Sequence, residues 1–309
     1  MKPPPFEYVR PTSVDAALAA LAEGDPDAKL LAGGQSLIPA MNFRLARPSL
    51  LVDLGGLAEL RGIRPLNGAA GHTEGGAAPD GSTGTGGGAS TGGLVIGAMT
   101  RQREVECSAL VRERCPLLAE VMPWIAHPQI RNRGTVGGSL AHADPAAELP
   151  AVMLALGATL VTRGPAGERR IPAADFFVGL FATALGPGEM LTRIEIPAAV
   201  PGTRFAFEEV SRRHGDFALA GVAVAVTADA GGIVQEASVC LLSVGDGPVA
   251  AGEGVAALRG RQLNVESATD AAEATAAALD PPGDIHASSA YRRHLARVLT
   301  RRALERAAA

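Results

Sequence analysis

The sequence predicts an α+β protein, and two observations lead to that class. In the N-terminal half, short apolar runs alternate with segments of helical spacing around two glycine-rich turns. Toward the C-terminus, several strand-like runs are followed by three helical segments, an order typical of α+β domains with an antiparallel sheet. A length of 309 residues fits about two domains, each large enough to bury a core.

Residues 1–55 are expected to form a first, compact unit. Thr12 and Ser13 can cap a helix in which Val14, Leu18 and Leu21 share one face. The expected elements are that helix, a strand at 29–32, a glycine turn, a helix over 36–45 and a strand at 50–52.

Residues 56–178 are expected to form a second unit, which segment 67–93 interrupts. This segment consists mostly of Gly, Ala, Ser and Thr and offers almost nothing to bury, so we interpret it as a flexible surface insertion. It would form the tip of a hairpin between the runs at 60–63 and 94–96. The expected elements that follow are a helix over 103–122, a glycine turn at 134–139, a helix over 149–156 and strands at 158–162 and 169–171.

Residues 179–309 are expected to form a third unit, in which strand-like runs come first and helical patterns follow. Strand-like runs occupy residues 190–196, 204–210, 220–227 and 233–244. Helical patterns follow at 248–258, 266–279 and 288–307. The last helix is rich in arginine, which we interpret as a solvated face.

Composition excludes several classes of function. The formal net charge of -4 argues against nucleic acid or an anionic membrane as the main partner. Lysine occurs only at Lys2 and Lys29, neither of them in a P-loop setting. The three cysteines form no CxxC pair, and no metal site is predicted. No apolar run is long enough to span a membrane and residues 1–11 lack a signal-type core, so we expect a cytoplasmic protein with reduced thiols.

The two glycine turns are the best candidates for a binding site. They are Ala32-Gly33-Gly34-Gln35-Ser36, between a strand and a helix, and Thr135-Val136-Gly137-Gly138-Ser139. Glycine allows close approach of a ligand, and the first N–H groups of a helix have no internal partner, so such turns can bind anions. Two turns that face each other could hold a pyrophosphate, although both can equally be plain tight turns. A GxGxxA match at Gly84, Gly86 and Ala89 lacks the strand and helix that a dinucleotide site needs.

Other constellations are less consistent with a catalytic site. Ser139, His142 and Asp144 resemble a hydrolytic triad in type, but triad members normally converge from separate segments. His142 and Asp144 lack a third clustered ligand for a metal. His214 with Asp216 fits a turn better than an acid–base pair. No catalytic side chain is therefore predicted.

Six stretches together resemble one known family. They are residues 29–38, 96–100, 127–139, 142–148, 195–197 and 212–217. In order and spacing they are similar to the FAD-binding medium subunit of molybdenum-containing hydroxylases, of the aerobic carbon monoxide dehydrogenase and bacterial xanthine dehydrogenase type. The similarity runs from about Phe6 to Arg302 and leaves out only the 67–93 insertion.

This resemblance implies a fold, a cofactor and partners. The fold would be a two-subdomain FAD-binding fold of the vanillyl-alcohol-oxidase type, over 1–55 and 56–178, followed by a smaller α+β domain over 179–309. The implied partners are a molybdopterin large subunit and a small subunit with two two-iron two-sulfur clusters, together a dimer of heterotrimers. Electrons would pass from the clusters through FAD to an external acceptor. A stand-alone FAD-dependent oxidoreductase and a nucleotide-binding scaffold without redox chemistry remain alternatives.

The resemblance also assigns residues to FAD. The first turn and its flanks would contact the pyrophosphate: Leu30, Leu31, Ala32, Gly33, Gly34, Gln35, Ser36 and Leu37. Thr135, Gly137, Gly138 and Ser139 would lie near the phosphates and the ribityl chain. Glu148 would accept hydrogen bonds from the sugar part. Thr100 and Asp144 would lie close to the flavin, with Ile125 and Leu191 beside its rings.

Two positions depart from the family pattern. Phe181 stands where the family often has a tyrosine, so the hydroxyl is missing. Glu208 stands where some relatives carry a lysine, so a positive charge near the flavin is missing.

Overall fold

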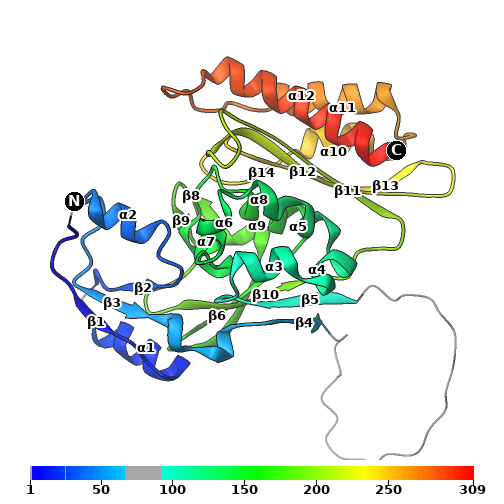
Figure 1. Cartoon of the computed structure of the whole chain (residues 1–309). Helices are drawn as coiled ribbons and strands as arrows, with labels where there is room; N and C mark the ends of the chain where they lie inside the picture. The colour runs from blue at the N-terminus through cyan, green and yellow to red at the C-terminus, as the bar shows by residue number, and fades with distance from the viewer. Residues whose placement is uncertain (1, 25, 67–91) are drawn as a thin grey trace, which may run out of the picture.

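The computed structural model describes residues 2–24, 26–66 and 92–309. It consists of a small parallel sheet, a larger antiparallel sheet covered by helices, and a second antiparallel sheet with its own helical layer (Figure 1). The GxGxxA match and nearly all of the expected insertion lie outside the described residues. Gly93, expected at its end, already belongs to a strand.

The first unit is built on a parallel sheet with the strand order β1-β3-β2. Its elements are β1 (Glu7–Val9), α1 (Val14–Glu23), β2 (Lys29–Leu31), α2 (Leu37–Asn42) and β3 (Leu50–Asp53), and the short 3-10 turns η1 (Leu54–Gly56) and η2 (Ala58–Leu60) follow. Ser13 caps α1 as expected, because its hydroxyl accepts the N–H of Ala16 at 3.1 Å. The second helix ends earlier than expected, since the chain turns at Arg44, where φ is 61°.

The second unit contains a five-stranded antiparallel sheet with the order β4-β5-β10-β6-β7. These strands are β4 (Ile63–Leu66), β5 (Gly93–Gly97), β6 (Thr159–Gly164), β7 (Gly167–Pro172) and β10 (Met190–Ile196). The strand at 190–196 has the expected bounds, but it lies between β5 and β6 rather than in the third unit. We therefore propose a boundary between β10 and the next strand, which begins at Thr203.

The helix expected over 103–122 is divided into three short helices. They are α3 (Gln102–Cys107), α4 (Ala109–Arg114) and α5 (Pro116–Val121), with η3 (Met122–Trp124) after them. Ser108 caps α4 and Pro116 begins α5, so both residues start a new helix. The remaining short elements are α6 (Pro128–Arg131), α7 (Val136–His142), α8 (Glu148–Ala155), α9 (Ala173–Phe176), β8 (Phe177–Gly179) and β9 (Ala182–Thr183).

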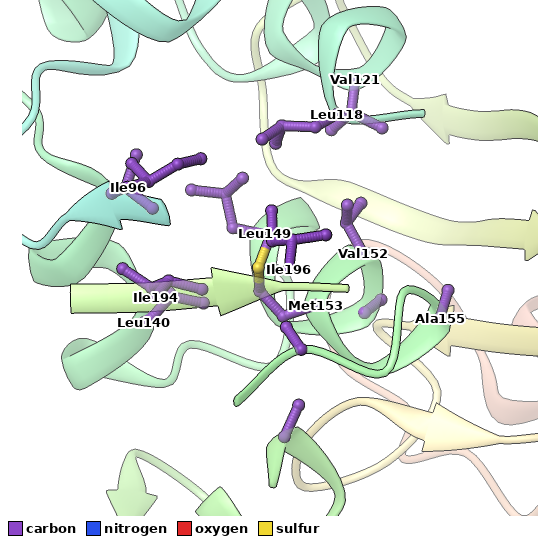
Figure 2. Packing of buried hydrophobic residues seen from close by; sticks show 14 of the residues in the cluster. Ile96, Leu118, Val121, Leu140, Leu149, Val152, Met153, Ala155, Ile194 and Ile196 are labelled. Carbon is purple, nitrogen blue, oxygen red and sulfur yellow. The ribbon is translucent and has the colours of Figure 1, made fainter. Parts of the chain in front are cut away.

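The main core lies between the five-stranded sheet and these helices (Figure 2). Ile96 of β5 and Ile194 of β10 are fully buried and pack toward Leu140 and Leu149. Helix α8 is apolar after Glu148 because it packs against the sheet of the third unit and against α5, α7 and α9.

The third unit has the expected α+β order. Its strands β11 (Thr203–Ser211), β12 (Ala218–Ala228), β13 (Val234–Leu242) and β14 (Val249–Ala250) form an antiparallel sheet in sequence order. Helices α10 (Gly252–Leu258), α11 (Val265–Ala277) and α12 (Ser289–Ala308) cover its outer face in Figure 1. Among the described helices, none combines the length and the apolar character that a membrane crossing requires.

Candidate functional site

The first glycine turn leads from β2 into α2 at the carboxyl edge of the parallel sheet, where Leu31 is in register with Asp53. Gly34 takes a φ of 75°, which a residue with a side chain rarely adopts. The backbone N–H groups of residues 33–37 donate no hydrogen bond to any other described residue. Such a run of unpaired N–H groups at the carboxyl end of parallel strands is typical of an anion site.

The second glycine turn behaves differently, because its amides are already bonded. Thr135 caps α7, and its hydroxyl accepts the N–H of Gly138 at 3.0 Å. The other N–H groups at this helix start donate to carbonyl oxygens: Val136 to Thr100, Gly137 to Ala98 and Ser139 to Thr135. The second turn therefore presents a tightly packed surface to a ligand rather than free donors.

The two turns lie against each other. A β-carbon added to Gly33 would be 2.5 Å from the carbonyl oxygen of Arg133 and 2.8 Å from Cα of Gly134. A β-carbon on Gly138 would be 3.2 Å from Cβ of Ala32. Since these contacts leave no room for side chains, the glycines are needed for the close approach of the two units.

Thr100, Ile125 and Leu191 are among the candidate residues that are buried in the protein. Thr100 is fully buried, and its hydroxyl accepts the N–H of Gly62 at 3.0 Å and donates to the carbonyl oxygen of Gly62 at 3.1 Å. Its own carbonyl oxygen accepts a hydrogen bond from the N–H of Val136. Thr100 thus supports the second turn. Ile125 and Leu191 are 7% and 4% exposed and belong to the main core.

The acidic candidates lie in the loop after α7 and at the start of α8. Asp144 forms an Asx turn, in which one carboxylate oxygen accepts the N–H of Ala146 at 2.9 Å. Glu148 begins α8 and is only 8% exposed. Burial raises the pKa of Glu148 to about 7, with a further contribution from the negative charge of Asp144.

Sequence reasoning missed Glu209, a second buried acid near Glu148. Burial raises the pKa of Glu209 to about 8, and the charge of Glu148 adds to the shift. Its Oε2 is buried and has no hydrogen-bond partner among the described residues. Glu208, which drew attention in the sequence, instead pairs with Arg306 at 2.8 Å. Side chains alternate along β11, so only one of two adjacent glutamates faces Glu148.

The aromatic and histidine candidates pack against each other. Phe181 has a φ of 52°, is 53% exposed and lies 5.1 Å from the ring of His142, between centroids. Among the described residues, no hydrogen bond joins His142 to Ser139 or Asp144, so the structure gives a triad no support. Within the described ranges, no group of three potential ligands could hold a metal ion.

Family models match nearly the whole chain. An FAD-binding domain found in molybdopterin dehydrogenases matches residues 4–78 and 88–199. The C-terminal domain of carbon monoxide dehydrogenase flavoproteins matches residues 205–307.

Individual proteins match over the same length. The chain is 41% identical to subunit alpha of the 6-hydroxypseudooxynicotine dehydrogenase complex of Paenarthrobacter nicotinovorans, over 99% of this chain and 96% of that protein. It is 39% identical to the carbon monoxide dehydrogenase medium chain of Hydrogenophaga pseudoflava, over 99% of this chain and 98% of that protein.

Solved structures agree with these matches. Carbon monoxide dehydrogenase from Hydrogenophaga pseudoflava superposes with a TM-score of 0.88 at 39% identity, covering 99% of this chain and 98% of that one. Quinoline 2-oxidoreductase from Pseudomonas putida 86 superposes with a TM-score of 0.87 at 37% identity, covering 100% of this chain and 98% of that one. The chain therefore belongs to the family of FAD-binding medium subunits of molybdenum hydroxylases, which includes the carbon monoxide dehydrogenase medium chains.

Proposed function

We propose that this chain holds FAD between its first two units and serves as the electron-transfer subunit of a molybdenum hydroxylase complex. The observation that carries the proposal is the run of unpaired N–H groups over residues 33–37. A pyrophosphate would supply the acceptors that these donors lack. The neighbouring second turn would confine it from the other side.

The remaining assignments follow from this placement. Leu30, Leu31, Ala32 and the residues from Gly33 to Leu37 would surround the pyrophosphate, with Thr135, Gly137, Gly138 and Ser139 opposite. Glu148 would accept hydrogen bonds from the sugar hydroxyls, and Asp144 would lie close to the flavin. Ile125 and Leu191 would contribute apolar surface at the flavin rings, and Thr100 would act through the second turn that it supports. When bound, FAD supplies the redox chemistry, and the protein supplies binding and orientation.

The proposed partners are a molybdopterin large subunit and a small subunit with two two-iron two-sulfur clusters, assembled as a dimer of heterotrimers. The names of the relatives support an assembly, since one is the alpha subunit of a complex and another a medium chain. We place the complex in the cytoplasm. The free thiols of Cys107, Cys115 and Cys240 are consistent with a reducing compartment.

The test is an absorbance spectrum of the full chain, purified alone and after coexpression with candidate partner subunits. The cofactor released on denaturation is then identified by chromatography against FAD and FMN. Near one FAD per chain, together with copurifying iron–sulfur and molybdenum subunits, is the expected result. No flavin under either condition, even after addition of FAD, would overturn the cofactor assignment. FAD with turnover of a substrate by the chain alone would favour a stand-alone oxidoreductase.

A further inference from the structure

A cluster of arginines borders the first glycine turn. Arg101 precedes α3, and its Nη1 donates to the carbonyl oxygen of Arg133. The same carbonyl oxygen lies 2.5 Å from the position of a β-carbon on Gly33. The Arg101 guanidinium is thus separated from the first turn by a single carbonyl group.

The positive charge of this cluster is poorly balanced. In the described part of the chain, no ion pair joins a carboxylate to Arg101 or Arg133. Glu104 is close in sequence, but its carboxylate accepts the backbone N–H of Arg101 at 3.0 Å. Asp53, another nearby acid, already accepts the hydroxyl of Tyr8 at 2.5 Å. The side chains of both arginines therefore retain hydrogen-bonding capacity for an anion.

The surroundings of Arg101 indicate the same shortage of negative charge. Burial, followed by the positive charges of Arg61 and Arg133, lowers the pKa of its guanidinium, and the charges of Glu104 and Asp53 only partly oppose them. An arginine remains protonated at neutral pH even so. A bound anion would relieve the repulsion among the three arginines.

We propose that Arg101, assisted by Arg133, neutralises the diphosphate of FAD beside the first glycine turn. This inference rests on the proposed function and adds to it a source of charge that neither turn contains. A guanidinium suits the role because its planar donors match phosphate oxygens. The cluster would make the site favour FAD over riboflavin, which lacks phosphate.

The experiment is a titration of the flavin-free full chain with FAD and with riboflavin, at several KCl concentrations. Arg101→Gln is compared with Arg101→Lys and with Arg103→Gln. Arg103 is a control two residues away on α3, and its side chain pairs with Glu106 at 3.0 Å. We expect Arg101→Gln to raise the Kd for FAD about 10- to 100-fold, as loss of a charge-assisted hydrogen bond does. It should also flatten the dependence of log Kd on log salt and leave riboflavin binding unchanged. Arg101→Lys keeps the positive charge but loses the planar donors, so it should recover only part of the affinity, whereas Arg103→Gln should retain all of it.

The outcomes separate this inference from the proposed function. A wild-type chain that binds FAD, with an Arg101→Gln variant of equal Kd and equal salt dependence, would overturn the inference alone. Equal weakening of FAD and riboflavin would assign Arg101 to structure and overturn it as well. A wild-type chain that binds no FAD would overturn both. If Arg101→Gln does not fold, Arg133→Gln provides the test, since the two side chains share the proposed role. An unchanged dependence of its Kd for FAD on salt would then overturn the inference, and a flatter dependence would support it.

Discussion

Glu148 and Glu209 come from different units, yet the negative charge of Glu148 contributes to the raised pKa of Glu209. Glu148 begins α8 of the second unit, and Glu209 lies on β11 of the third. Both are less than a tenth exposed, and burial raises the pKa of Glu148 to about 7 and that of Glu209 to about 8. Arg131 is engaged by Glu106, and its positive charge only partly opposes the effect of burial on the pKa of Glu148.

This pair predicts that stability falls as the pH rises. An unfolded glutamate releases its proton near pH 4.5, whereas the folded pair retains its protons until about pH 7 and 8. Between these values the native state binds more protons than the unfolded state, so the free energy of unfolding decreases from about pH 5 to pH 9. The loss is on the order of 3 kcal/mol for Glu148 and about 5 kcal/mol for Glu209. Urea unfolding of the flavin-free chain across this range measures it.

Substitution separates the contribution of Glu209 to this pH dependence from that of Glu148. Glu209→Gln should reduce the pH slope and make the chain more stable than wild type at pH 9. Glu208→Gln is the matched control, because Glu208 is adjacent on β11 but pairs with Arg306. It should leave the slope between pH 6 and 9 unchanged. An unchanged slope in Glu209→Gln would show that this carboxyl does not titrate in the window.

Gly33→Ala should impair both folding and FAD binding. Its new β-carbon would lie 2.5 Å from the carbonyl oxygen of Arg133, so the backbone of one turn must move. We expect a loss of about 1–3 kcal/mol in unfolding free energy, as overpacking usually costs. Gly252→Ala is the control, because a β-carbon there meets nothing within 4 Å. Urea midpoints and FAD titrations measure the two effects, and a normal Kd in Gly33→Ala would contradict a ligand site at this turn.

The local elements were largely predictable, because they depend on nearby residues. Ser13 as a cap, the bounds of the strand at 190–196 and the three C-terminal helices all follow from local patterns. The unit to which that strand belongs was not predictable in the same way. Its pairing with β5 and β6 is a contact between segments far apart in sequence.

The candidate site shows the same division. Both glycine turns were visible in the sequence. The sequence did not show that the N–H groups of the first turn are unpaired whereas those of the second are already bonded. The N–H groups of Val136 and Gly137 are satisfied by Thr100 and Ala98, which lie on another segment. Likewise, alternation along a strand shows that Glu208 and Glu209 face opposite ways, but it does not show which one meets another acid.

Thr135 should act as a cap that holds the second turn. Its hydroxyl accepts the N–H of Gly138, and the residue is 1% exposed. Thr135→Ala should lower the unfolding free energy by about 1–2 kcal/mol, the range for loss of a cap. Thr135→Ser retains the oxygen and should recover most of that loss. Equal destabilisation by Ala and Ser would instead assign the effect to the packing of the missing methyl group. Thermal or urea unfolding of the three proteins decides between these explanations.

Arg131 should be among the most sensitive positions near the site. Its guanidinium is almost fully buried, binds both carboxylate oxygens of Glu106 at 2.8 and 3.0 Å, and donates to the carbonyl oxygens of Ile125 and Ala126. Arg131→Leu leaves the two carbonyl oxygens without their donor and leaves Glu106 with only the half-exposed Arg103, which should cost about 3–5 kcal/mol in urea unfolding.

The second arginine on Glu106 provides the control for this prediction. Arg103 is about half exposed, so Arg103→Leu should cost far less than Arg131→Leu although it removes a contact to the same carboxylate. The hydrogen bond from Arg131 also keeps the pKa of Glu106 below its usual value. The contribution of the pair should therefore be present above pH 4.5 and disappear as the pH falls below it. Equal losses in the two variants would mean that burial does not distinguish the two ion pairs, and that Arg131 does not hold the Ile125–Ala126 segment in place.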